Sequence, residues 1–165
     1  MKNFYIVFLL LFTISLNAQQ NNCGSEKHNE FDFWIGSWEV FDEKGKLLGT
    51  NTITKKYDNC VLTESWVSSG KNKGTSINFY NRNDNSWNQI WVDNSGYTLS
   101  LKGKLENGVM VLKSDIQKNK KGNYYNQISW TLNNDESVTQ LWEVFSEKHV
   151  KISEAFKGIY KKKLN

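Results

Sequence analysis

Short segments in which polar and apolar residues alternate follow one another along almost the whole chain after residue 30. Successive side chains of a β-strand point to opposite faces, so this period of two predicts strands with one buried face. Turn residues separate the segments, as at Asn107-Gly108, where both residues tolerate positive φ. The chain has no proline, which favours uninterrupted hydrogen-bonded strands. We predict ten strands, at 33–41, 48–57, 61–67, 75–81, 86–92, 97–105, 109–116, 124–132, 138–145 and 149–160.

Ten strands linked by hairpins need a way to protect their edges. An all-β, closed antiparallel up-and-down barrel removes the edges and leaves an interior that can hold a small molecule. A two-sheet sandwich is the main alternative. The predicted barrel domain covers residues 31–163, and an N-terminal arm at 19–30 contains one short helical pattern at 26–30.

The first 18 residues have the pattern of a signal peptide. Lys2 is basic, residues 4–16 form an apolar run, and Ala18 places a small residue at the cleavage point. The run is shorter than the roughly 20 apolar residues of a membrane span. We therefore expect an exported protein, periplasmic or extracellular, without a membrane span. Cys23 leaves a lipoprotein as an alternative, although the residues before it are Gln20-Asn21-Asn22 and not small or apolar.

Cys23 and Cys60 are the only cysteines of the chain. Export to an oxidising compartment favours a disulfide between them, and two unrelated thiols are the alternative. Their spacing and that of the two histidines match no metal site, so no metal is predicted. The formal charge of +4 over 165 residues comes from scattered lysines. Such a charge does not predict a nucleic-acid partner.

Three strands repeat one pattern, a polar residue followed two positions later by tryptophan. Residues two apart share a strand face, so each pair presents an aromatic plate beside a polar group. We predict that these faces line the barrel interior and bind a small hydrophobic or aromatic molecule. In the alternative interpretation, the polar groups only satisfy the indole N–H groups and the neighbouring backbone, which makes a mixed core. The predicted ligand-binding residues are Glu64, Trp66, Gln89, Trp91, Gln140 and Trp142.

Glu64 is the sharpest chemical candidate, because burial of its carboxyl would raise its pKa and suit it to acid–base chemistry. Pairing with a lysine at the barrel mouth is the structural alternative. His149 is a candidate haem ligand or an exposed turn residue, and His28 is expected to be solvated. No Ser-His-Asp set is readable, so no catalytic residue is assigned and enzymatic activity stays open.

A resemblance adds to this interpretation. Gly36-Ser37-Trp38 looks like the Gly-x-Trp motif of the lipocalins and the wider calycin group. There the tryptophan packs across the closed end of the barrel beneath a basic residue, a position that Lys161 would take here, so the resemblance gives Gly36 and Trp38 structural roles. More specifically, the chain resembles an uncharacterised family of exported bacterial lipocalin-like domains at 31–38, 60–66, 89–94, 140–143 and 156–160.

That resemblance implies the barrel fold and transfers no settled activity or cofactor. The chain also resembles the nitrobindin-like haem barrels, but more distantly. The function predicted from the sequence is therefore an exported barrel that binds a small hydrophobic or aromatic ligand inside. A haem-binding barrel and an enzyme that uses Glu64 as its acid or base are the alternatives.

Overall fold

The computed structural model describes residues 23–163. The predicted signal peptide at 1–18 lies outside the described residues. Within the described range the chain forms a short helix α1 (Glu26–Asn29) and a 3-10 turn η1 (Asp32–Trp34), followed by strands only. The strands are β1 (Gly36–Phe41), β2 (Leu47–Lys56), β3 (Val61–Ser68), β4 (Lys73–Asn81), β5 (Ser86–Asp93), β6 (Thr98–Glu106), β7 (Val109–Lys113), β8 (Gln117–Asn119), β9 (Gly122–Leu132), β10 (Val138–Ser146) and β11 (Lys151–Lys162).

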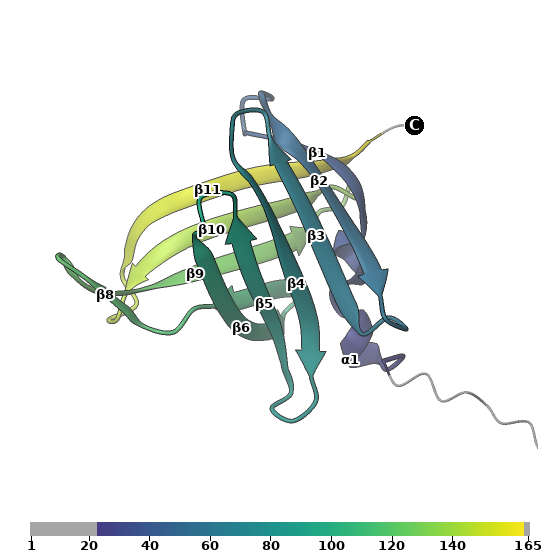
Figure 1. Cartoon of the computed structure of the whole chain (residues 1–165), viewed down its shortest axis with the longest axis horizontal. Helices are drawn as coiled ribbons and strands as arrows, with labels where there is room; N and C mark the ends of the chain where they lie inside the picture. Colours follow the sequence, from purple (N-terminus) through teal and green to yellow (C-terminus); the bar gives the residue numbers. More distant parts are fainter. Residues whose placement is uncertain (1–22, 164–165) are drawn as a thin grey trace, which may run out of the picture.

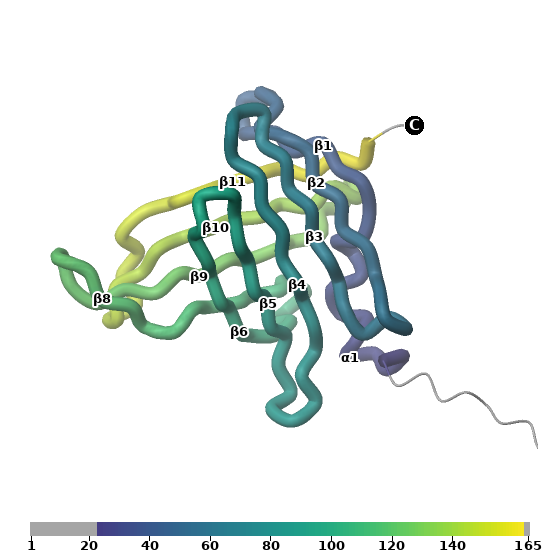
Figure 2. Tube along the Cα trace, viewed as in Figure 1, coloured from purple at the N-terminus to yellow at the C-terminus, as the bar shows by residue number. Residues whose placement is uncertain are grey.

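The strands close into an antiparallel barrel, as predicted (Figure 1). Consecutive strands pair from β1 to β7, then β7 pairs with β9, β9 with β10 and β10 with β11. Pairing of β11 with β1 completes the ring of ten strands, with Val40 opposite Tyr160. This last ladder excludes the sandwich alternative, because no edge is left between two separate sheets. The tube in Figure 2 shows β9, β10 and β11 crossing behind β3, β4 and β5.

Two predicted strand boundaries differ from the structure by three residues. The first strand was expected to begin at Phe33, but residues 32–34 form the 3-10 turn and β1 begins at Gly36. The expected strand at 109–116 ends at Lys113 instead. Beyond it, the Asn126 backbone N–H donates to the Ser114 hydroxyl at 2.9 Å, and the Ser114 backbone N–H donates to the Asn126 carbonyl at 2.9 Å. The chain then forms β8, a short hairpin partner of β9 that projects from the ring (Figure 1).

Aromatic side chains fill the end of the barrel that the N-terminal arm covers. Phe31 stacks on Trp34 with ring centroids 5.0 Å apart, and it meets Trp87 and Trp130 edge-on. Trp34 and Trp130 are fully buried. Large aromatic rings give much buried area and a specific contact geometry, so this cluster forms a rigid base for the barrel.

Trp38 joins the arm to the barrel wall. Its indole N–H donates to the Trp34 carbonyl at 2.9 Å, and the side chain is buried. Gly36 has a φ of +148°, a region in which only glycine is unstrained. The lysine over the Trp38 ring is Lys162, at 5.6 Å from its centroid, and not the expected Lys161. Lys162 pairs with Trp38 across β1 and β11, and its neighbour Lys161 points to the opposite face.

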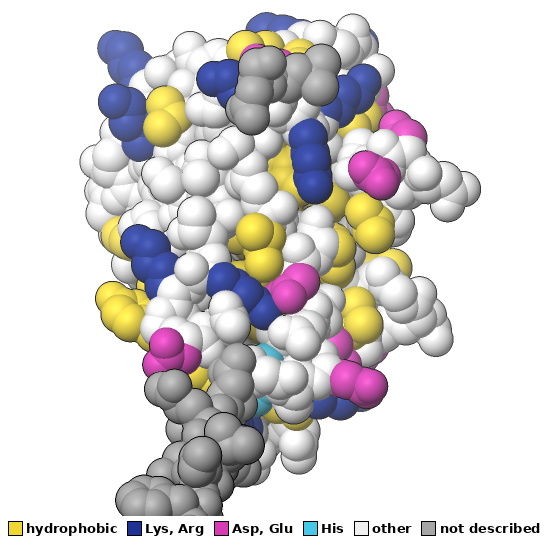
Figure 3. Space-filling view, turned by 90° about the vertical axis from the view of Figure 1, so that its right-hand side faces the viewer, with side chains coloured by type: hydrophobic (Ala, Val, Ile, Leu, Met, Phe, Trp, Pro, Cys, Tyr) yellow, Lys and Arg dark blue, Asp and Glu magenta, His cyan; other side chains and the backbone are white. Residues whose placement is uncertain are grey.

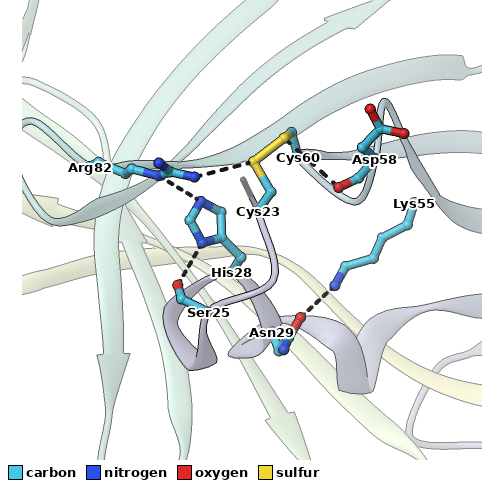
Figure 4. Close-up of a disulfide and its surroundings, with 8 residues drawn as sticks. All are labelled: Cys23, Ser25, His28, Asn29, Lys55, Asp58, Cys60 and Arg82. Atoms are coloured by element: carbon cyan, nitrogen blue, oxygen red, sulfur yellow. Dashed lines mark hydrogen bonds between the residues drawn. A yellow bond between two sulfur atoms is a disulfide. The ribbon is translucent and has the colours of Figure 1, made fainter. Parts of the chain in front are cut away.

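The predicted disulfide joins Cys23 in the arm to Cys60 before β3 (Figure 4). The disulfide engages the Cys23 sulfur, which a lipoprotein would link to a lipid instead. His28 lies beside the bridge and is only 4% exposed, so the expectation of a solvated histidine was wrong. Its Nδ1 lies 2.7 Å from the Ser25 hydroxyl, and burial lowers its pKa, with Arg82 and Lys55 adding to the effect. The helix docks this imidazole against β4.

Charged side chains are scattered over the outer surface. Figure 3 shows lysine and arginine interspersed with acidic and uncharged polar side chains on one face. Ion pairs join neighbouring strands, for example Lys151 with Glu143 at 2.6 Å. In the described part of the chain, no helix is long and apolar enough to cross a membrane.

Candidate functional site

A cavity of about 200 Å³ lies within the barrel. Asn72, in the loop between β3 and β4, is one of its lining residues. The disulfide and α1 lie at the other end of β3, so the cavity faces away from the aromatic base. All six residues of the polar-x-Trp pairs line this one cavity. The full lining is Glu64, Trp66, Asn72, Gln89, Trp91, Leu99, Ile128, Gln140, Trp142, Ala155, Phe156 and Tyr160.

Strand register brings the pairs together. Across β3 and β4, Glu64 lies opposite Ser76, and across β4 and β5, Ser76 lies opposite Trp91. The Trp91 ring covers Gly74, where an added Cβ would lie 2.2 Å from a ring carbon. Glycine at this position thus makes room for the indole. The third pair, on β10, comes from the part of the barrel wall formed by β9, β10 and β11.

Glu64 is 5% exposed and lies at the centre of a buried polar network. One carboxylate oxygen accepts a hydrogen bond from the Asn51 amide at 2.7 Å, and the other accepts one from the Ser76 hydroxyl at 2.6 Å. Burial raises the pKa of Glu64, and these two hydrogen bonds partly oppose the shift. Both partners are neutral side chains. The alternative in which a lysine pairs with Glu64 was therefore wrong.

The network continues on both sides of Glu64. On one side, the Gln89 amide donates to the Asn78 carbonyl at 2.9 Å, and the Asn78 amide donates to the Ser76 hydroxyl at 2.9 Å. On the other side, the Asn51 amide donates to the Tyr160 hydroxyl at 3.3 Å. Such networks hold their members in fixed positions when most of their hydrogen-bonding groups are satisfied.

Tyr160 connects this network to the far wall of the cavity. Its hydroxyl donates to the Gln140 side-chain carbonyl. Burial raises the pKa of Tyr160 well above its usual value, and the nearby Glu64 charge adds to the shift. The phenol therefore stays protonated and keeps Gln140 oriented.

Sequence reasoning missed Asn51, Ser76, Asn78 and Tyr160. Each occupies a buried position of an alternating strand, so polar residues at inward positions were the available signal. The sequence could not show which of them meet, because that depends on the register between strands.

The aromatic walls keep their own contacts. Trp66 and Phe156 meet edge to face with ring centroids 6.1 Å apart. The Trp142 indole N–H donates to the side-chain carbonyl of Asn126 at 2.9 Å. Glu64, Gln89 and Gln140 bond to other polar side chains and not to the indole N–H groups. Trp66, Trp91 and Trp142 are all half-buried at the cavity. Strands β3, β5 and β10 thus each contribute one polar and one aromatic side chain to the cavity.

Neither histidine lines the cavity. His149 lies exposed in the turn between β10 and β11 with a φ of +62°, and its Nδ1 is 3.0 Å from the Tyr125 hydroxyl. His28 belongs to the arm at the opposite end. The residues present therefore do not fit a haem held by His149 inside the barrel. Among residues 23–163, no three His, Cys, Asp or Glu side chains form a cluster that could hold a metal ion.

A comparison of the chain with protein-family models finds no match, and a comparison with curated proteins finds no significant match. The class of the protein is therefore defined by its fold and its cavity. It is a closed antiparallel β-barrel, stabilised by one disulfide, with a small internal cavity lined by both polar and aromatic side chains.

Proposed function

We propose that this protein is an exported carrier or receptor barrel that binds a small, ring-containing molecule in its interior. The observation that carries the proposal is the convergence of three polar-x-Trp pairs on one cavity. The half-buried rings of Trp66, Trp91 and Trp142 supply apolar contact area, and Glu64, Gln89 and Gln140 supply fixed polar groups. Binding sites for small molecules combine these two kinds of surface.

The size of the cavity limits the ligand. An apolar cavity of about 150 Å³ is large enough to bind benzene. The present cavity, about 200 Å³ in volume, accommodates one ring with a short substituent. Long fatty acids and large polycyclic molecules exceed it.

Export and family membership are part of the same proposal. The leader pattern at residues 1–18 and the Cys23–Cys60 disulfide both fit an oxidising compartment. The F-D-F-W-x-G-x-W start and the barrel topology support membership of the exported lipocalin-like domains.

Native mass spectrometry of the mature protein, purified from its exported location, tests the binding function. We expect an additional mass that is lost when the same sample is denatured. Trp66→Ala, Trp91→Ala and Trp142→Ala each remove a cavity wall and should reduce the occupied fraction. Tyr57→Ala removes an exposed aromatic residue outside the cavity and serves as the control. If all three cavity variants fold and retain the additional mass, the cavity is not the binding site.

An acid–base enzyme is the second candidate, and the raised pKa of Glu64 inside a cavity favours it. Such an enzyme would convert the copurifying molecule during incubation. Glu64→Gln would abolish turnover, and the molecule would remain bound.

A further inference from the structure

The cavity contains an acidic group and no basic one. Among its lining residues Glu64 is the only ionisable side chain besides Tyr160, and no lysine, arginine or histidine reaches the cavity from the described part of the chain. In the described part of the chain, no side chain forms an ion pair with the Glu64 carboxylate. A buried carboxylate without a cationic partner is unfavourable, and proteins normally pair such a group.

The hydrogen bonds around Glu64 can hold its ionised form once a cationic ligand is bound. The Asn78 amide donates to the Ser76 hydroxyl, which therefore directs its single proton to Glu64. The Asn51 amide donates to the second carboxylate oxygen. Both oxygens thus act as acceptors, as a carboxylate does, and each has a lone pair left for a further donor. Neutral donors hold the carboxylate in place but do not neutralise its charge.

The surrounding indole rings also favour a cationic ligand. Indole rings attract cations to their faces, and tryptophan is the strongest of the aromatic side chains in this respect. Trp66 and Trp91 lie two positions along β3 and β5 from Glu64 and Gln89, and Trp142 lies on β10. A cation in the cavity would therefore meet a carboxylate and aromatic faces together. An anion would meet the Glu64 charge with no base to offset it.

From this juxtaposition we infer that the ligand is a small arylalkylamine, bound in its protonated form. Its ammonium group donates to the free lone pairs of Glu64, and its ring packs among Trp66, Trp91 and Trp142. One ring and a short aminoalkyl chain fit the cavity volume of about 200 Å³. The inference rests on the proposed binding function and adds the charge of the ligand to it.

Binding of an ammonium ion also has a pH signature. Burial raises the pKa of Glu64, so the empty protein retains a proton there above the usual range of a glutamate. The amine displaces that proton, and its affinity therefore rises as the pH rises through the pKa of Glu64. The other titratable group facing Glu64 is Tyr160 from β11, which stays protonated throughout. The remaining neighbours do not titrate; they are Asn51, Ser76, Asn78, Gln89 and Gln140.

Three probes that share a phenethyl group test the inference: phenethylamine, phenethyl alcohol and hydrocinnamate. They carry a cation, a neutral hydroxyl and an anion on the same ring system. Binding to the mature oxidised protein is measured by quenching of tryptophan fluorescence and by calorimetry. We expect the amine to bind about tenfold or more tightly than the alcohol, since close buried charge pairs contribute at least that factor. Hydrocinnamate should bind most weakly.

Glu64→Gln removes the charge and keeps the side-chain shape. In this variant the amine should lose its preference over the alcohol, while the affinity for the alcohol changes little. Glu106→Gln removes a charge from an exposed position outside the cavity and should leave the preference intact. A Glu64→Gln variant that folds and still prefers the amine overturns the inference.

The wild-type protein provides a second test that does not depend on a variant. The affinity for phenethylamine should rise as the pH rises through the raised pKa of Glu64, while the amine stays protonated like a lysine. The affinity for phenethyl alcohol should not rise. Equal or tighter binding of the alcohol or of hydrocinnamate overturns the charge inference and leaves the binding function supported. If none of the probes binds, the arylalkylamine inference fails, and the native mass spectrum decides the binding function separately.

Discussion

Loss of the Cys23–Cys60 disulfide should destabilise the barrel by an amount that the structure fixes. The bridge closes a loop with a sequence separation of 37 residues. In the chain-entropy treatment, a loop of that length lowers the entropy of the unfolded chain enough to stabilise the fold by about 3.8 kcal/mol. For a domain of this size, such a change lowers Tm by roughly 8–15 °C.

Urea unfolding of the Cys23→Ser/Cys60→Ser variant, compared with the oxidised wild type, measures this effect. Chemical reduction of the wild type is the matched control, because it breaks the same bond without a substitution. The variant and the reduced protein should lose similar amounts of unfolding free energy. The dependence on urea should become steeper, since an unbridged chain exposes more surface when it unfolds. A loss below about 1 kcal/mol in both samples would refute the entropic account, which requires several times that amount.

Three further predictions concern single residues. The raised pKa of Glu64 means that the folded state keeps a proton which the unfolded state has already lost, so this group lowers stability as pH rises through that interval. Glu64→Gln should therefore gain in Tm relative to the wild type as the pH rises above about 4, the usual pKa of a glutamate, and a constant difference across thermal melts would contradict this. Gly74→Ala should displace the Trp91 ring, shift the tryptophan emission and cost about 1–3 kcal/mol in urea unfolding; unchanged emission and stability would contradict the close approach. Gly36→Ala should cost about 1 kcal/mol or more because of its φ of +148°, and a neutral result in urea unfolding would show that the backbone there relaxes.

The fold was predictable because alternation is a local signal that the whole barrel repeats. Nine of the ten predicted strands begin within two residues of the strand that forms there, and the exception is the first strand. There, Phe33 and Trp34 are residue types that favour strands, but burial of the Phe31 and Trp34 rings within the aromatic base favours a tight turn. At these residues the packing of the aromatic base outweighs the local strand propensity.

The cavity was partly predictable for a similar reason. The polar-x-Trp pairs mark one strand face each, and their inward direction follows from alternation alone. The partners of Glu64 do not follow from alternation, because Asn51 and Ser76 come from neighbouring strands whose register the sequence leaves open. The burial of His28 could not be predicted either, since it depends on the docking of the arm against β4 beside the disulfide.

The seven tryptophans of the chain offer the most direct test of the cavity as a binding site. Their indole N–H signals in a nitrogen–proton correlation spectrum report separately on the cavity and on the rest of the barrel. A titration with phenethylamine or phenethyl alcohol should shift the signals of Trp66, Trp91 and Trp142. The signals from the buried core and base should stay in place; they belong to Trp34, Trp38, Trp87 and Trp130. Shifts confined to this second group, or an unchanged spectrum at saturating probe, would contradict a binding site between the three polar-x-Trp pairs.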